Sequence, residues 1–165
     1  MREILRKIFG DKWFGPGGTF GSYVSEIDHP IFGKLIFSQG ANGPYWIHET
    51  YENSSKEEVC VSIDTVGTEP PSKKQKEFYS NVIEQLDEYF QKASDLIVPE
   101  YESYLSETFP LRWKDAFRLA SLNVPLEGDE MRKWDITFEC KTKNSGFLFT
   151  CYFENGKPLY VGVDT

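Results

Sequence analysis

Residues 133–154 read KWDITFECKTKNSGFLFTCYFE, and this stretch decides the fold. Apolar and polar side chains alternate on both sides of a short polar segment, a pattern typical of a β-hairpin with one buried face. A two-residue turn at 144–145 would place Cys140 opposite Phe149, so that the apolar rows of both strands share one face. The stretch therefore predicts an antiparallel sheet that is covered on one side.

A second hairpin follows, with its turn in residues 154–156. A two-residue turn would pair Phe153 with Pro158 and would put the apolar residues of the last strand on the opposite face. A three-residue loop pairs Phe153 with Lys157 and restores a common apolar face. We therefore predict a type I turn with Gly156 in the left-handed conformation as a G1 bulge, which a negative φ at Gly156 would contradict.

Strand signals occur in two groups, one on each side of a helical region. β-branched and aromatic segments bounded by turn residues predict strands at 23–27, 34–37, 45–51, 59–66, 117–124, 133–141, 147–154 and 159–163. Between the groups, apolar residues from Phe78 to Leu96 recur three or four positions apart, which predicts a long helix over about 72–96. Pro99 is expected to end this helix and to open a shorter one over about 99–108.

The separation of strands from helices indicates the fold class. The sequence lacks strand–helix–strand alternation, so a parallel Rossmann-type sheet is not expected. We predict an α+β fold, in which a mainly antiparallel sheet of about seven to eight strands packs against the two helices. Residues 22–165 are expected to form a single domain, preceded by a basic, glycine-rich segment over 1–21 that carries no P-loop motif.

Composition narrows the classes of partner. The chain has 165 residues and a net charge of −8, from 26 acidic and 18 basic residues. An acidic surface repels the nucleic-acid backbone, so we expect no nucleic-acid partner, and the charge favours a basic partner or simply solubility. Three widely spaced cysteines without a C-x-x-C motif suit a reducing compartment. The opening residues hold no apolar run long enough for a signal peptide or a membrane span, so a cytoplasmic protein without membrane contact is expected.

The sequence contains no recognisable catalytic, cofactor-binding or metal-binding motif, so we expect a protein without cofactor that is not an enzyme. His29 lies in a turn, where a solvated or turn-capping role is expected, and His48 is expected to be a hydrogen-bonded strand residue. Glu49 and Glu52 lie among aromatic residues, as a glycoside hydrolase would require, although carboxylates at strand ends are usually solvated.

Acidic residues gather in two segments, 49–69 and 99–108. Such clusters can steer a basic protein partner, and tyrosines among them suit a protein interface, although an ordinary charged surface has the same composition. The residues that we expect to contact a partner are Glu49, Glu52, Glu57, Glu58, Glu100 and Glu102, with Tyr45, Tyr51 and Tyr101 as anchors. The alternative is a small-ligand-binding or hydrolytic enzyme with a pocket between sheet and helix. That pocket would lie near Trp46, His48 and Trp134.

Two parts of the chain resemble a family of uncharacterised bacterial domains. The opening resemblance rests on FGKL at 32–35 and PYW at 44–46, and the closing one on KWDITF at 133–138 and ENGKP at 154–158. The resemblance covers about residues 22–165. Domains of this family are often suspected immunity proteins of bacterial toxin systems, so the resemblance implies a small acidic cytosolic protein that neutralises a basic toxin by tight binding. An accessory protein that acts through self-association remains a further alternative.

Overall fold

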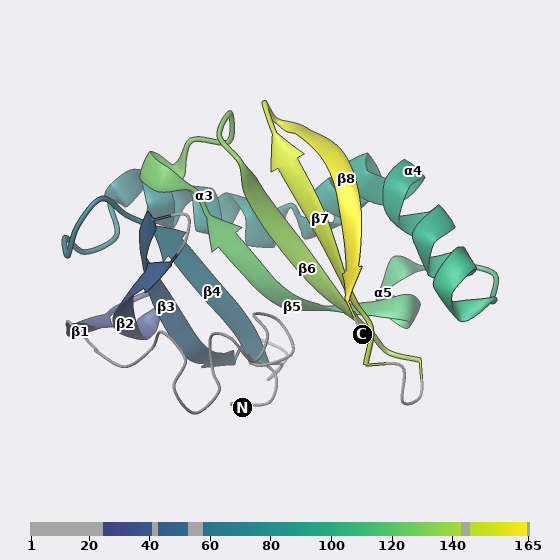
Figure 1. Cartoon of the computed structure of the whole chain (residues 1–165), viewed down its shortest axis with the longest axis horizontal. Coiled ribbons are helices and arrows are strands. Elements are labelled where there is room, and N and C mark those ends of the chain that lie inside the picture. Colours follow the sequence, from purple (N-terminus) through teal and green to yellow (C-terminus); the bar gives the residue numbers. More distant parts are fainter. Residues whose placement is uncertain (1–24, 41–42, 53–57, 143–145, 165) are drawn as a thin grey trace.

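In the part of the chain that the structure describes, eight strands form one sheet in the order in which they occur in the sequence (Figure 1). The computed structural model describes residues 25–40, 43–52, 58–142 and 146–164, with the backbone alone at 49–52 and 58. The strands are β1 (Glu26–His29), β2 (Gly33–Gly40), β3 (Gly43–Glu52), β4 (Glu58–Asp64), β5 (Phe117–Val124), β6 (Trp134–Cys140), β7 (Leu148–Glu154) and β8 (Lys157–Asp164). Neighbouring strands are antiparallel except β4 and β5, which are parallel. The predicted α+β fold with a mainly antiparallel sheet is confirmed. The N-terminal segment over 1–21 lies outside the described residues.

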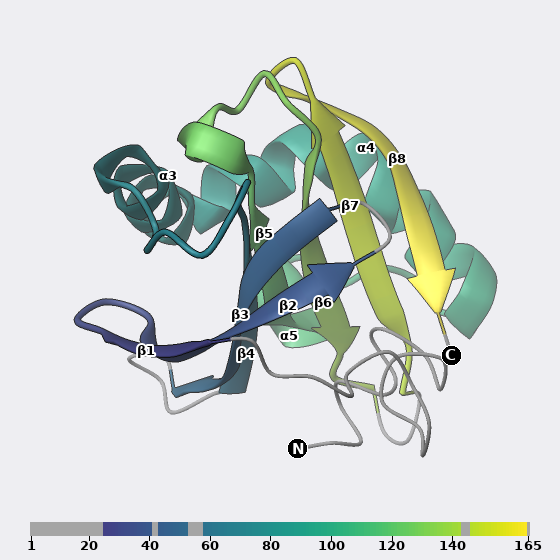
Figure 2. The ribbon, with the colours of Figure 1, turned by 60° about the vertical axis from the view of Figure 1, so that its left-hand side comes forward.

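The helices between β4 and β5 pack on one face of the sheet (Figure 2). They are α3 (Lys73–Glu84), α4 (Leu86–Leu105) and the short α5 (Trp113–Ala116), and a 3₁₀ helix, η1 (Leu126–Gly128), follows β5. This long connection returns the chain to the end of the sheet at which β4 begins, so β4 and β5 run in the same direction. The sheet therefore has one face covered by helices and one face that the helices leave open.

The helical region divides at a different residue from the one predicted. The long helix breaks at Gln85, whose φ of −106° and ψ of 24° are not helical, and Pro99 lies inside α4 instead of between two helices. A proline removes one N–H, so the carbonyl of Asp95 loses its helical partner. Both residues are exposed, and water can satisfy that carbonyl, so the helix continues to Leu105.

The β6–β7 hairpin keeps the predicted faces in a different register. Phe138 pairs with Phe149, and the N–H of Cys140 donates to the carbonyl of Phe147 at 3.0 Å. The predicted pairing of Cys140 with Phe149 is therefore wrong by two residues. A shift of two preserves the side of the sheet on which each side chain lies, so the apolar rows still share one face. The predicted turn residues 144–145 lie outside the described part of the chain.

The β7–β8 hairpin reaches a common apolar face by a different device from the one predicted. Gly156 has the expected positive φ, 68°, but Asn155 also has a positive φ, 54°, so the turn is a two-residue type I′ turn and the predicted type I loop is wrong. Phe153 consequently pairs with Pro158. The register shifts beside this pair, with Leu159 as the extra residue, and Val161 then comes opposite Cys151.

The core lies between the helices and the covered face of the sheet. Trp134 is 2% exposed, with its ring stacked on Phe153 at 4.4 Å between ring centroids. Phe78 of α3 and Tyr89 of α4 meet the same indole edge to face, at 5.0 and 5.4 Å. Aromatic pairs in these geometries stabilise a core beyond their area of burial. Trp134 therefore joins both helices to the sheet.

Candidate functional site

The open face of the sheet carries polar side chains where the covered face carries apolar ones. Strand pairing aligns them in rows: Ser62 lies opposite Asn123, Asp135 opposite Tyr152, and Thr137 opposite Thr150. We call this set the polar face, and it consists of Ser62, Asp64, Ser121, Asn123, Asp135, Thr137, Thr150 and Tyr152. Next to it, a small apolar cluster of Ile36, Ile47 and Cys60 occupies the same side of β2–β4. The polar face therefore lies over β4 to β7.

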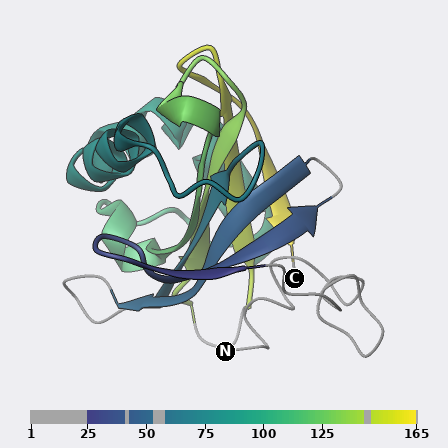
Figure 3. The ribbon, with the colours of Figure 1, turned by 90° about the vertical axis from the view of Figure 1, so that its left-hand side faces the viewer.

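A cleft of about 420 Å³ lies over the polar face. Its lining includes residues from the start of β3, such as Pro44 and Tyr45, and also Asp164 at the end of β8. These elements belong to opposite halves of the sheet, and Figures 2 and 3 show the sheet curling so that β2 and β3 turn toward β8. Twist of this kind accumulates from strand to strand. The curl therefore turns the open side of the sheet into a hollow.

Buried polar contacts fix the edge of the cleft at the ends of β4 and β5. The side chain of Gln75, in the first turn of α3, donates to the carbonyls of Asp64 and Pro125 at 2.7 and 3.2 Å. Gln75 also forms a capping box with Ser72, which starts the helix at this point. The start of α3 therefore holds the backbone of Asp64 in place. The carboxyl of Asp64 belongs to the polar face.

The carboxyl of Asp64 has partners among the cleft residues. Asn123 donates from Nδ2 to Asp64 Oδ1 at 3.1 Å and to Ser62 Oγ at the same distance. Burial raises the pKa of Asp64, while the hydrogen bond from Asn123 and the positive charge of Arg132 act in the opposite direction. Arg132 also forms an ion pair with Asp129 at 3.8 Å. Asp64 is thus a half-buried, partly compensated carboxylate.

Asp135 is the more strongly perturbed carboxyl of the cleft. Burial, and then repulsion from Asp64, raise the pKa of Asp135 from 3.8 to about 7. Its cross-strand neighbour Tyr152 has a pKa raised to about 12, chiefly by burial and then by Asp135. The ring of Tyr152 stacks on Tyr160 of β8 at 4.5 Å. The floor of the cleft therefore combines a carboxyl group of raised pKa with an aromatic surface.

Hydroxyl groups complete the floor of the cleft. Thr137 Oγ1 and Thr150 Oγ1 lie 3.0 Å apart and are both buried, so they share one hydrogen bond. A hydroxyl can also accept a second hydrogen bond, which leaves acceptor capacity toward a ligand. Tyr45 closes the opposite side, where burial raises its pKa and a hydrogen bond with Ser38 lowers it. The cleft thus presents carboxylate, hydroxyl and phenol oxygens to an occupant.

The predicted partner-binding residues whose side chains the structure describes do not form one surface. Tyr45 lines the cleft, whereas Glu100 and Glu102 lie on α4, which packs against β8 on the covered side. Tyr101 was predicted as an anchor, but it is 4% exposed and packs edge to face against Phe117 at 5.4 Å, so that prediction is wrong. Of the remaining predicted residues, Glu57 and the side chains of Glu49, Tyr51, Glu52 and Glu58 lie outside what the structure describes.

Glu102 has a structural contact. Its Oε1 accepts the backbone N–H of Phe109 at 3.0 Å, across the loop that follows α4. This bond holds Phe109 beside Phe90, with their rings stacked at 6.0 Å. The residue contributes to the folding of this loop in addition to any role at the surface.

The alternative pocket between sheet and helix is occupied by packed side chains. Trp46 and Trp134 are 0% and 2% exposed and belong to the core, and His48 is also buried. None of the three is among the residues that line the described cleft. Burial lowers the pKa of His48. The cleft lies on the opposite face of the sheet.

His29 has the capping role that its turn predicted. Its Nδ1 accepts the backbone N–H groups of Ile31 and Phe32, both at 3.2 Å. The imidazole is buried, so it is not the solvated side chain of the other prediction. Burial, and then the charge of Lys76, lower the pKa of His29.

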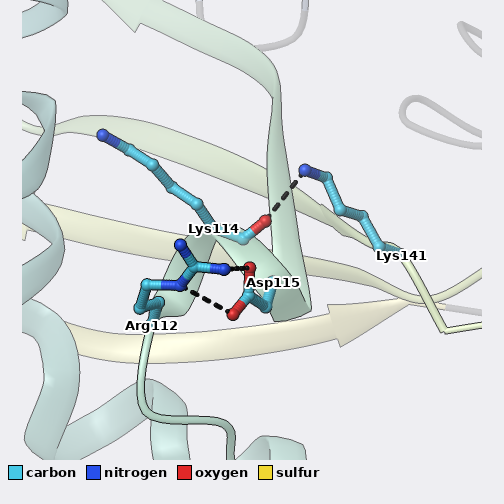
Figure 4. Close-up of polar contacts among 4 residues, drawn as sticks. All are labelled: Arg112, Lys114, Asp115 and Lys141. Carbon is cyan, nitrogen blue, oxygen red and sulfur yellow. Dashed lines mark hydrogen bonds and ion pairs between the residues drawn. The ribbon is translucent and has the colours of Figure 1, made fainter.

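A basic cluster next to α5 is tied down by its own contacts (Figure 4). Arg112 makes two hydrogen bonds to Asp115, at 3.0 and 2.9 Å, and Lys141 donates to the carbonyl of Lys114 at 2.9 Å. Lys114 also pairs with Asp87 of α4 at 2.7 Å. These groups fasten α5 to α4 and to the end of β6, and we describe them as structural.

Comparison with protein-family models, with curated proteins and with solved structures found no match to this chain. Among the described residues, no group of three or more histidine, cysteine or acidic side chains is placed to hold a metal ion. In the same part of the chain, each helix is too short or too polar to cross a membrane.

Sequence reasoning missed the polar face, although its signal was present. Ser62 and Asp64 alternate with apolar residues along β4, and Asp135 and Thr137 do so along β6. The alternation identified a wetter side of each strand. What the sequence could not show is that the sheet curls and gathers these residues around one hollow.

Proposed function

We propose that this protein is a non-catalytic binding module that receives a basic protein partner on its polar face. The observation that carries the proposal is the charge of the cleft, whose described lining includes Asp64, Asp135 and Asp164 against Arg132 alone. A partner that presents lysine or arginine side chains complements this charge. The net charge of −8 would add long-range attraction for the same partner.

The composition of the cleft also supports a protein partner. Tyr45 and Tyr152 line it, and tyrosine is a residue type enriched at protein interfaces because it offers a large apolar ring with a polar tip. The resemblance of residues 22–165 to bacterial immunity domains suggests that the partner is a basic toxin. In that case the chain would neutralise the toxin by covering it, with no chemical step.

A second candidate is a small-ligand-binding protein, because a cleft of about 420 Å³ is within the size range of small-molecule sites. The two candidates differ in how strongly binding depends on charges at the rim of the cleft. A small cationic ligand would bind with little dependence on charges at the rim, whereas a basic protein would be steered by them.

Capture from the native cell with matched variants tests the proposal. Asp64→Asn with Asp164→Asn removes two charges from the cleft, and Glu84→Gln with Asp95→Asn removes two from exposed sites on α3 and α4. We expect the wild type and the helix variant to retain the same basic protein, and the cleft variant to lose it. The purified pair should then associate at least about tenfold more slowly with the cleft variant, with an affinity that falls as salt rises.

Three results would refute the proposed function: an acidic partner, a partner retained equally by both double variants, or an affinity that ignores salt. The toxin assignment has a separate test. Expression of the captured partner alone should arrest growth, and co-expression of this chain should relieve the arrest. A captured basic protein that is harmless when expressed would support the binding function and refute the toxin assignment.

A further inference from the structure

Asp135 is a cleft carboxyl for which the described part of the protein supplies no hydrogen bond or ion pair. It lies on the interior strand β6, lines the cleft and is half-buried, and burial is the main influence on its ionisation. Within the described residues, its carboxyl makes no hydrogen bond or ion pair, and the charged group that shifts its pKa is Asp64, which repels it. A half-buried carboxyl that lines a cleft and has no partner within the protein is costly to ionise, so it indicates a group that arrives from outside.

Neighbouring carboxylates show what Asp135 lacks. Asp64 receives a hydrogen bond from Asn123 and lies in the field of Arg132. Asp129 accepts the N–H of Met131 and pairs with Arg132. On the same side of the sheet, Glu139 forms an ion pair with Arg118. The chain therefore supplies donors to the carboxylates around Asp135 and leaves this one open toward the cleft.

We propose that the cleft is a guanidinium site, in which Asp135, with Asp64 beside it, binds an arginine side chain of the partner. This inference rests on the proposed function and names the group that the partner inserts. A guanidinium is planar and carries five N–H donors, so it can serve the carboxylates of β4 and β6 together. It is also less strongly hydrated than an ammonium, which suits an enclosed site.

The aromatic wall of the cleft fits the same group. Tyr152 lies directly opposite Asp135 on β7, and its ring stacks on Tyr160. A guanidinium that bonds to Asp135 lies beside this ring, and such planes stack on aromatic faces. The shared hydroxyls of Thr137 and Thr150 lie one row along the same strands and offer a further acceptor. The donor plane thus meets carboxylate, ring and hydroxyl in one place.

Binding at this site should be coupled to a proton. With a pKa of about 7, Asp135 is ionised in about a tenth of molecules at pH 6 and in about nine tenths at pH 8. The cation binds the ionised form, so its apparent affinity should rise about tenfold between these pH values. The other titratable or charged groups of the cleft lining are Asp64, Arg132, Tyr152, Asp164 and Tyr45. Tyr152 stays neutral over this range.

The test uses the full chain, labelled with ¹⁵N, and n-butylguanidinium chloride as the probe. We expect amide shifts that saturate around Asp135, about tenfold tighter binding at pH 8 than at pH 6, and weaker binding of n-butylammonium. Asp135→Asn should abolish the response, because the amide brings its own donors and no charge. Asp95→Asn, which changes an exposed carboxyl on α4, should leave the response unchanged. Tetramethylammonium, a cation without N–H groups, controls for screening.

The inference is overturned if tetramethylammonium or n-butylammonium binds as well as the guanidinium, or if the response survives Asp135→Asn. It is also overturned if affinity is the same at pH 6 and pH 8. These failures are separate from failure of the proposed function. A basic partner that still requires Asp64 and Asp164 would uphold the function without the guanidinium site. A partner bound elsewhere would refute both the function and the insertion of its arginine here, even if the cleft binds the free probe.

Discussion

Replacing Asp135 with asparagine should stabilise the protein, and the increase should grow with pH. Asparagine has nearly the same shape and carries no charge, so the variant removes the ionisation of a half-buried group and little else. The pKa of Asp135 rises from 3.8 to about 7 on folding, so the folded state binds this proton more tightly than the unfolded state. The contribution of this carboxyl to stability is therefore fully present below pH 4 and is lost as pH rises through 7.

The size of the effect follows from the shift of the pKa. Each pKa unit corresponds to about 1.4 kcal/mol, so a shift of about three units sets an upper limit of about 4 kcal/mol at pH 8. Relaxation of the site and entry of water reduce this, and we expect about 2–4 kcal/mol between variant and wild type. At pH 4 the wild-type carboxyl is neutral when folded, so the difference should be close to zero.

Urea unfolding at a series of pH values measures this difference. With a slope of about 2 kcal/mol per molar urea, the variant's midpoint should lie about 1–2 M above the wild type at pH 8. Asp95→Asn is the control, because it alters an exposed carboxyl and should shift the midpoint by little at any pH. A difference between variant and wild type that stays constant from pH 4 to pH 8 would show that Asp135 ionises normally, and the reasoning about the cleft would fail.

Three further predictions concern the fold. Gly128→Ala should destabilise the protein by more than about 2 kcal/mol in urea unfolding, because a Cβ at this site would lie 2.4 Å from the carbonyl oxygen of Lys74 and φ is +65°. An unchanged midpoint would contradict this close contact. Gly156→Ala should cost about 1–2 kcal/mol through its positive φ alone, because nothing lies within 4 Å, and Gly156→Asn should recover most of that stability. Equal stability of the two variants would argue against the type I′ turn. The Cys151 thiol, whose burial raises its pKa to about 12, should resist a thiol reagent at pH 8 until urea unfolds the chain, and rapid labelling of the native protein would place it at the surface.

The fold was largely predictable because its signals are local. Alternating side chains along β6 and β7 determine which side of the sheet each residue occupies, and that survives a register error of two. The same reasoning required a common apolar face in the last hairpin, and the structure supplies one through a bulge at Leu159 instead of a longer turn. A longer turn and a bulge both give a common apolar face, and the sequence pattern does not distinguish between them.

The wrong predictions occur where the tertiary structure overrides a rule that depends on local sequence. Pro99 was expected to divide the helices, yet its exposed position lets the helix continue through it. The candidate site was harder to predict, because it depends on the curl of the whole sheet. Residues from β2–β3 and from β8 are far apart in both sequence and sheet order, and they line one cleft because strand twist accumulates. Counting acidic residues along the chain therefore favoured Glu100 and Glu102 over Asp135.

The most direct test is a map of where a bound basic partner touches this chain. Amide chemical shifts of the ¹⁵N-labelled chain, recorded with and without the captured partner, resolve the two faces of the sheet. We predict that the largest changes fall on polar-face residues such as Asp135, Thr150 and Tyr152, with smaller changes along α3 and α4. Changes concentrated on the helices, with the polar face unaffected, would contradict the assignment of the binding site.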